Sequence, residues 1–243
     1  MGKKPMKGLQ LKVIKGEDRS PLRFTVRRMI NAGYVGRDTE AVRAHVEELR
    51  QHGVPPPPSV PVLIPVLSQN ITSAGEIEVV GSKTSGEVEF VLLVKGSDIY
   101  VGVGSDHTDR ALERISIVMS KQVCPNVLSR ELWDYEDVKS HWDHLLLQSW
   151  TKTHESEKER LYQKTQLSAI ISAEDILDLV ESRMADGQKD GLVIFSGTVA
   201  TLTGDIIYGS YFRGELIDSN LKRKLTCEYR VKTLDYLGNV EDF

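Results

Sequence analysis

The chain has 243 residues, and 40% of them are hydrophobic, which is enough for a buried core in a single domain. Its net charge of −4, with basic and acidic residues well mixed, excludes the strongly basic surface typical of proteins that bind nucleic acids or anionic membranes. The two cysteines are too few for a disulfide framework, and no apolar run is long enough for a secretory signal or a membrane span. We therefore expect a cytoplasmic protein with one domain over residues 1–243, a mobile start at residues 1–8, and no nucleic-acid or membrane partner.

Short apolar runs bounded by turn residues predict strands along the whole chain. The predicted strands are residues 9–14, 24–29, 60–67 and 76–80, a hairpin within 86–109, and then 147–150, 160–163, 191–195, 206–217 and 225–234.

Two segments have clear helical signals. Residues 42–49 follow possible caps at Asp38 and Thr39 and place apolar side chains on one helical face. Residues 173–184 follow Ser172, with Asp175 in the position of a capping box. Residues 111–121 fit either a helix or a strand. Many strands with two good helices predict an α+β or mostly β fold.

The hairpin within residues 86–109 brings carboxylates together. A Gly-Ser turn that pairs Lys95 with Asp98 sets the register of both strands. Counting back from the turn places Glu87 opposite Asp106 and Glu89 beside them on the same face, since side chains alternate across a strand.

Three like charges on one face need a positive partner, and oxygen ligands alone suit Mg²⁺, Mn²⁺ or Ca²⁺. The alternative is that this face of the strand is exposed and the glutamates are solvated. His45 presents a similar choice, because it lies on or beside the apolar stripe of its helix with Glu48 one turn on. The residue pattern alone leaves open whether His45 is a core residue or a catalytic one.

The order of several short motifs resembles the fumarylacetoacetate hydrolase superfamily. Glu-x-Glu at Glu87 and Glu89, followed by Asp106 in an Asp-x-Thr-x-Arg sequence, matches the metal site of that superfamily in order and spacing. The other matching motifs are Gly-Arg ending at Arg37, His-x-x-Glu at His45 and Glu48, Ser-Lys ending at Lys121, Tyr-Gln ending at Gln163, and the strand that ends in Gly197 and Thr198. More narrowly, the chain looks like a bacterial branch of the superfamily known as a domain of unknown function.

The chain also departs from the superfamily pattern. Three extra residues separate Arg37 from His45, Val199 replaces a proline, and His107 stands beside the metal aspartate. We expect the substrate end of the site to be remodelled and His107 to be a substrate contact specific to this branch.

The resemblance implies a mixed β-roll, usually a homodimer, with Mg²⁺ or Mn²⁺ held by Glu87, Glu89 and Asp106. It implies His45, oriented by Glu48, and Lys121 as catalytic residues. The residues implied to bind the substrate are Arg37, His107, Gln163, Gly197 and Thr198.

The activity that this implies is metal-dependent hydrolysis of a carbon–carbon bond in an acylpyruvate-like 2-oxo or 2,4-dioxo carboxylic acid. Decarboxylation of an oxaloacetate-type acid is the alternative, as are hydration and isomerisation on the same scaffold. A metal-binding or ligand-binding protein without turnover belongs to a different class and also remains open.

Overall fold

The computed structural model describes residues 7–51, 57 and 59–236, without the side chains of His45, Glu48, Leu49 and Gln51. The α-helices are α1 (Thr39–Gln51), α2 (Arg110–Glu113), α3 (Ile117–Val123) and α4 (Ala173–Arg183), and three short 3-10 turns occupy Tyr135–Asp137, Lys139–His144 and Leu167–Ala169. The strands are β1 (Lys7–Lys15), β2 (Asp18–Val26), β3 (Arg28–Gly33), β4 (Val62–Val66), β5 (Ile71–Thr72), β6 (Glu76–Val79), β7 (Thr84–Ser85), β8 (Val88–Lys95), β9 (Asp98–Asp106), β10 (Thr108–Asp109), β11 (Asn126–Leu128), β12 (Glu131–Asp134), β13 (Leu146–Lys152), β14 (Arg160–Gln166), β15 (Leu192–Phe195), β16 (Tyr211–Asp218) and β17 (Arg223–Thr233).

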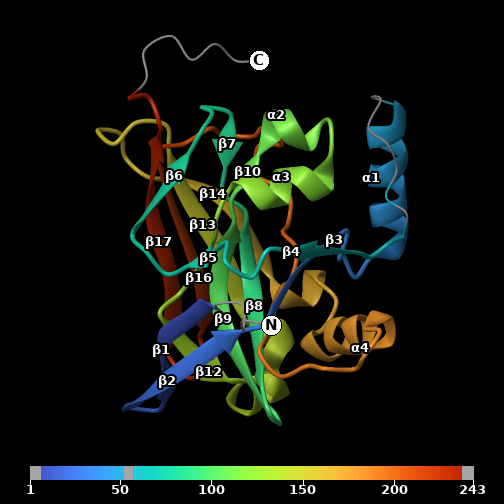
Figure 1. Ribbon diagram of the computed structural model, residues 1–243, viewed down its shortest axis with the longest axis vertical. Helices are drawn as coiled ribbons and strands as arrows, with labels where there is room; N and C mark the ends of the chain where they lie inside the picture. The colour runs from blue at the N-terminus through green and yellow to red at the C-terminus, as the bar shows by residue number, and fades with distance from the viewer. Residues whose placement is uncertain (1–6, 52–56, 58, 237–243) are drawn as a thin grey trace, which may run out of the picture.

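The strands form two large mixed sheets and one small one. The larger sheet runs β2-β1-β12-β9-β8-β15-β3-β4, with β11 and β5 added beside β9, and the smaller runs β14-β13-β16-β17-β6. The third sheet contains only β7 and β10. Figure 1 shows β17 and β16 on one side of the molecule, α1 and α4 on the other, and α2 with α3 at the top beside β7 and β10. The α+β class predicted from the sequence is confirmed.

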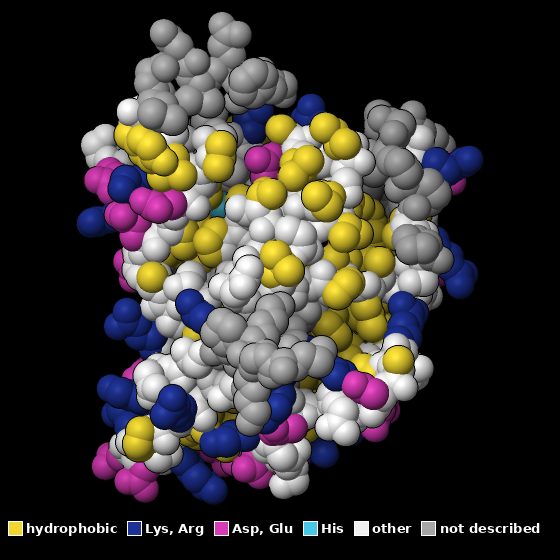
Figure 2. Space-filling model, viewed as in Figure 1, with side chains coloured by type: hydrophobic (Ala, Val, Ile, Leu, Met, Phe, Trp, Pro, Cys, Tyr) yellow, Lys and Arg dark blue, Asp and Glu magenta, His cyan; other side chains and the backbone are white. Residues whose placement is uncertain are grey.

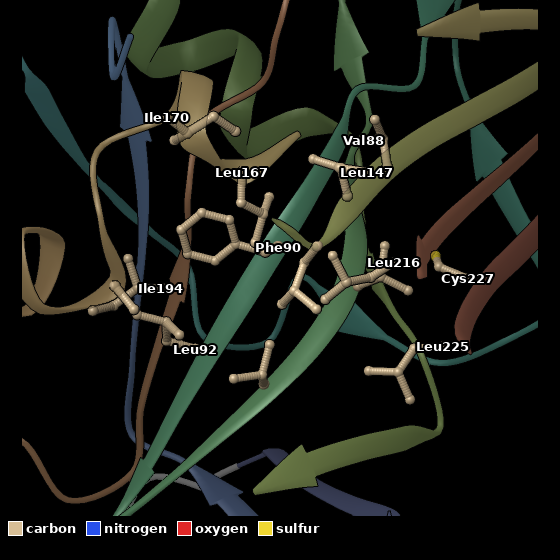
Figure 3. Packing of buried hydrophobic residues seen from close by; sticks show 14 of the residues in the cluster. Val88, Phe90, Leu92, Leu147, Leu167, Ile170, Ile194, Leu216, Leu225 and Cys227 are labelled. Atoms are coloured by element: carbon tan, nitrogen blue, oxygen red, sulfur yellow. The ribbon is translucent and has the colours of Figure 1, made fainter. Parts of the chain in front are cut away.

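The hydrophobic core between the sheets explains why β8 is apolar on both faces. Val88, Phe90 and Leu92 pack with Leu147 and Leu216 of the smaller sheet (Figure 3). The opposite face of β8 carries Val91 and Leu93, which belong to a second buried cluster that includes Phe195. A strand that is buried on both faces reads as a continuous apolar run, so a glutamate within it needs a specific reason to be there.

The start of the chain is more regular than the sequence indicates. β1 and β2 pair as a hairpin, and β1 includes Lys7 and Gly8, the last two residues of the predicted mobile start, whose mobility stays a prediction. Residues 1–6 of that prediction lie outside the described residues. The predicted strand 24–29 divides at Arg27, since β2 ends at Val26 and β3 begins at Arg28.

The helix caps follow the sequence closely. Asp38 accepts hydrogen bonds from the backbone N–H groups of Glu40 and Ala41, both at 3.0 Å, and so caps α1. Ser172 and Asp175 form the expected capping box of α4. The segment that fitted either a helix or a strand forms α2 and α3, capped by Asp109 and Ser116. None of the helices in the described part of the chain combines the length and hydrophobicity that a membrane crossing requires.

Candidate metal centre

The hairpin of β8 and β9 creates a cluster of three carboxylates. Lys95 pairs with Asp98 and Glu89 with Gly104, as the turn predicted. One step beyond the ladder, the backbone N–H of Asp106 donates to the carbonyl of Glu87 at 3.2 Å. One carboxylate oxygen from each of Glu87, Glu89 and Asp106 lies within 4.8 Å of the other two. The predicted convergence of the three residues is therefore present in the structure.

The cluster is buried, and the alternative of solvated glutamates does not hold. Glu89 is 1% exposed and Asp106 2% exposed, whereas the side chain of Glu87 keeps 16% of its surface open. Gly104 makes room beside them, because a Cβ atom there would lie 2.7 Å from the Phe195 ring and 2.7 Å from the carbonyl oxygen of Val127. Any larger residue would force the strands apart next to the carboxylates.

Two buried basic side chains face the cluster. The Lys121 ammonium lies 2.7 Å from Asp106 Oδ2 and 3.0 Å from Glu87 Oε2, and it also donates to Thr108 Oγ1 at 2.8 Å. The Arg110 guanidinium binds Glu87 Oε1 at 3.0 Å. Both oxygens of Glu87 therefore have a cationic partner, whereas Glu89 has none among the described residues.

This arrangement gives the three carboxylates different proton affinities. Burial alone would raise the pKa of Glu87, but the charges of Arg110 and Lys121 outweigh burial and lower that pKa to about 2. Burial, followed by the charges of Asp106 and Glu87, raises the pKa of Glu89 well above its usual value. Burial also raises the pKa of Asp106 despite the nearby Lys121. The Glu89 side is thus where negative charge is least compensated.

The donor set fits a divalent cation. Asp106 Oδ1 is buried and has no hydrogen-bond partner among the described residues, which is costly for a carboxylate oxygen. A cation bound by Asp106, Glu87 and Glu89 would satisfy that oxygen and remove the repulsion that raises the pKa of Glu89. Carboxylate oxygens are the ligands that Mg²⁺ and Mn²⁺ prefer.

A second segment fixes the Glu89 side of the cluster. The backbone N–H of Gly197 donates to Glu89 Oε2 at 2.9 Å. Gly197 has φ +85, and a Cβ atom there would lie 2.8 Å from the carbonyl oxygen of Ala32, so glycine is required by both conformation and space.

Gln163 and Thr198 support this segment from the interior. Gln163 accepts from the backbone N–H of Val88 at 3.1 Å and donates to Thr198 Oγ1 at 2.8 Å. Thr198 Oγ1 in turn donates to the carbonyl of Val88 at 2.9 Å. Gln163, Thr198 and Gly197 are therefore brought to the cluster as predicted, but these contacts hold the backbone next to Glu89. Their predicted contact with substrate stays a prediction.

His107 lies behind the cluster. Its Nδ1 is 2.9 Å from the Tyr229 hydroxyl, its Nε2 is 2.9 Å from Thr84 Oγ1, and the residue is 1% exposed. Burial and the charge of Arg110 lower the pKa of His107 to about 3, so the ring is neutral. Both ring nitrogens are used inside the protein, and this arrangement favours a supporting role over the predicted substrate contact.

Of the remaining predicted residues, Arg37 pairs with a different carboxylate, and the side chains of His45 and Glu48 lie outside the described residues. Arg37 binds both oxygens of Asp143, at 2.7 and 2.8 Å, and donates to the carbonyl of Ile170. This pairing gives Arg37 a role in joining segments at the surface. His45 and Glu48 belong to α1, but their side chains lie outside the described residues, so the catalytic pair stays a prediction.

Two residues near the cluster, Glu113 and Tyr34, were not predicted, and a third, Arg110, entered the sequence analysis only as the arginine of the Asp-x-Thr-x-Arg sequence. Arg110 and Glu113 pair at 2.8 Å across the short helix α2, and Glu113 also lies 3.7 Å from the Lys121 ammonium. Tyr34 has φ 56, an uncommon value for a residue with a side chain, and its pKa is raised by burial and by Glu113. The i,i+3 spacing of Arg110 and Glu113 was the available sequence signal, whereas the φ of Tyr34 has none.

A model of the family described as protein of unknown function (DUF2848) matches residues 32–229. The chain belongs to this family. The matched span contains the three carboxylates, Lys121 and the segment ending in Thr198. No curated protein gives a significant match.

Solved structures are similar over most of the chain. A 2-keto-3-deoxyarabinonate dehydratase gives a TM-score of 0.64 at 13% identity, covering 90% of this chain and 86% of that one. The same type of dehydratase complexed with magnesium and 2,5-dioxopentanoate gives 0.61 at 15% identity, covering 85% of this chain and 73% of that one. A 5-carboxymethyl-2-hydroxymuconate delta-isomerase from Mycobacterium smegmatis gives a TM-score of 0.60 at 15% identity, covering 89% of this chain and 86% of that one. This DUF2848 member therefore has the mixed β-roll of the fumarylacetoacetate hydrolase C-terminal type.

Proposed function

We propose that this DUF2848 protein is a metal-dependent enzyme that acts on a 2-oxo carboxylic acid. The observation that carries the proposal is the buried carboxylate cluster with the unpartnered Asp106 Oδ1. A fold built for stability alone gains nothing from three carboxylates buried together, two of which have raised pKa values. The complex of a structurally similar dehydratase with magnesium and 2,5-dioxopentanoate supports both the cation and the class of ligand.

The roles of the residues follow from their contacts. Glu87, Glu89 and Asp106 would hold Mg²⁺ or Mn²⁺, and the bound cation supplies Lewis-acid polarisation of an oxo-acid carbonyl. Arg110 fixes Glu87, and the Gly197 N–H fixes Glu89, so the carboxylates are preorganised. The fixed positive charge of Lys121 lies beside them and favours the negative charge that develops when an oxo acid becomes an enolate.

His45, oriented by Glu48, is the proposed base: a ring nitrogen of His45 takes a proton from water or from the substrate. The reaction that we favour is hydrolysis of a carbon–carbon bond in an acylpyruvate-like 2,4-dioxo acid, with decarboxylation as the alternative. Hydration or isomerisation is the second candidate, because similar structures carry the names of a dehydratase and an isomerase. We also propose a cytoplasmic homodimer.

The test of metal binding is calorimetric titration with Mg²⁺ and Mn²⁺. Asp106→Asn is expected to weaken binding about 100-fold, because a ligand oxygen and its charge are lost. Asp98→Asn is the matched control, since this aspartate is at the opposite end of the same strand. Wild-type affinity in Asp106→Asn would contradict the proposed site.

The test of turnover is a panel of 2-oxo and 2,4-dioxo acids followed by ultraviolet absorbance, with and without metal. Metal-dependent loss of the enol absorbance of a 2,4-dioxo acid supports hydrolysis. Tight metal-dependent binding of oxalate, an enolpyruvate mimic, without turnover of any acid would instead indicate a binding protein.

A further inference from the structure

Glu113 is a fourth carboxylate at the metal centre, and its position differs from that of the other three. It lies at the end of α2, and its side chain is 28% exposed, against 16% for Glu87 and 3% for Asp106. Among these side chains, Glu113 is therefore the most accessible to solvent.

The carboxylate of Glu113 lies next to both basic side chains of the site, Arg110 and Lys121. Its Oε2 binds Arg110 at 2.8 Å, and its Oε1 lies 3.7 Å from the Lys121 ammonium. These two cations also bind Glu87, and Lys121 binds Asp106. Both basic side chains that contact the cluster are thus engaged with carboxylates before any substrate arrives.

The charges of these side chains and of a bound divalent cation consequently cancel, so the site has no spare positive charge for a second carboxylate on the substrate. With all carboxylates ionised around a metal, Glu87, Glu89, Asp106 and Glu113 exceed Arg110 and Lys121 by two negative charges, which a divalent cation offsets. A second carboxylate on the substrate would have to displace Glu113 from Arg110 and Lys121, or it would meet the negative charge of Glu113 beside them. Like charges in such a partly buried place disfavour binding.

The surface next to Glu113 is apolar. Figure 2 shows hydrophobic side chains gathered over α2 and α3 and in the furrow between these helices and α1. Ile115 is 81% exposed, and Val118 and Met119 of α3 are about half exposed. An uncharged, apolar chain leaving the metal would find contacts along this surface.

We infer that Glu113 selects a substrate that carries one carboxylate, at the 2-oxo acid end, and an uncharged tail. This inference rests on the proposed function and narrows its substrate class. Glu113 is a specificity-determining residue in this assignment, because its charge discriminates between substrate tails and it takes no part in bond breaking.

Two 2-oxo acids with the same number of carbon atoms isolate the effect of the charge on the substrate tail. 2-Oxopentanoate and 2-oxoglutarate both present a 2-oxo acid to the metal, and they differ in a terminal methyl group against a terminal carboxylate. Calorimetry with the Mg²⁺-loaded full chain measures the affinity ratio. The wild type is expected to bind 2-oxopentanoate about tenfold or more tightly than 2-oxoglutarate, which corresponds to about 1.4 kcal/mol.

Glu113→Gln removes the charge and leaves Arg110 and Lys121 each with one fewer carboxylate partner. We expect 2-oxoglutarate to bind about tenfold more tightly to this variant and 2-oxopentanoate to bind as before. Glu113→Asp keeps the charge and is expected to retain the wild-type preference. Glu78→Gln makes the same change in net charge on β6, where Glu78 pairs with Lys232, and is the matched control.

Equal or tighter binding of 2-oxoglutarate by the wild type would overturn the inference, and so would an unchanged ratio in Glu113→Gln. Oxalate binding distinguishes a failure of the role assigned to Glu113 from a failure of the proposed function. If Mg²⁺-dependent oxalate binding occurs but the tail preference is absent, only the role of Glu113 fails. If oxalate does not bind either, the proposed function fails as well.

Discussion

The two glutamates of the Glu-x-Glu motif are expected to contribute differently to the stability of the metal-free protein, because their carboxylates have different partners. Glu87 is held by Arg110 and Lys121 on both of its oxygens, and these cations lower its pKa to about 2. Glu89 accepts a hydrogen bond from the backbone N–H of Gly197, and burial, followed by the charges of its neighbours, raises its pKa. A neutral glutamine should therefore be tolerated better in place of Glu89, which has no cationic partner among the described residues, than in place of Glu87, whose charge Arg110 and Lys121 bind.

The expected result is a contrast between two identical substitutions on one strand. With metal chelated, Glu87→Gln should lower the free energy of unfolding by about 3–5 kcal/mol, because it leaves Arg110 and Lys121 with less compensation. Glu89→Gln should leave stability unchanged or raise it. The contribution of Glu87 is complete above its unfolded pKa of about 4.5 and is lost as the pH falls toward its folded value of about 2. Urea unfolding at pH 7 and pH 3 measures both effects, and equal losses in the two variants would contradict this account.

The positions of the three clustered carboxylates could be predicted from the sequence because they depend on local features of one hairpin. Strand alternation and the turn at residues 95–98 are enough to place Glu89 opposite Gly104 and Glu87 opposite Asp106. The contacts that the sequence could not provide come from distant segments. The bond from Gly197 to Glu89 depends on how β15 ends beside β8, and the left-handed φ of Tyr34 depends on packing around it.

At the scale of elements, helix ends were predicted more accurately than strand ends. Side chains of the first turn determine where a helix starts, so the capping box of α4 can be read from adjacent residues. Strand ends depend on a partner strand. The predicted strand 206–217 begins only at Tyr211, because β16 is defined by its pairing with β13 and β17. The predicted strand 60–67 narrows to β4 for the same reason, since it pairs with β3 only over Val62–Val66.

The cap of α4 provides a test at this scale. Ser172→Ala removes the hydroxyl that accepts from the backbone N–H of Asp175 at 3.1 Å and donates to Asp175 Oδ2 at 2.7 Å, and leaves the bond from the backbone N–H of residue 172 to Asp175 in place. We expect a loss of about 1 kcal/mol in the free energy of unfolding. Ser182→Ala is the control, because that serine lies near the other end of the same helix and bonds only to the carbonyl of Leu179. Thermal unfolding followed by circular dichroism compares the two variants. Equal decreases in their unfolding temperatures would show that the capping box adds no stability.

At the scale of the whole molecule, the fold is held by the contact of two sheets over one core. The larger sheet contributes Phe90 and Ile194 to this core, and the smaller contributes Leu216, Leu225 and Cys227 (Figure 3). Alternation predicted that Glu87 and Glu89 share one face of their strand. The order of strands in each sheet could not be predicted, because strands far apart in sequence, such as β6 and β17, become neighbours.

The two cysteines report on the integrity of that core. Both are free and buried, and Cys227 donates to the carbonyl of Val127 at 3.6 Å. Burial raises the pKa of Cys124 to about 12 and also raises that of Cys227, so at pH 8 both are thiols in the folded protein. An unfolded cysteine has a pKa of about 8.5 and provides appreciable thiolate, which is the reactive form.

We therefore expect iodoacetamide at pH 8 to leave both cysteines unmodified in the native protein and to modify both in urea. Because the folded state favours the thiol, the stability that this burial contributes is complete below pH 8.5 and declines as the pH rises above it. Mass spectrometry counts the modified cysteines during a urea titration. Labelling of both should follow the loss of tryptophan fluorescence, since opening the interface between the sheets requires unfolding of the whole core. If Cys227 were labelled in the native state at a rate close to that of the unfolded chain, the two sheets would not form the single cooperative unit that their shared core indicates.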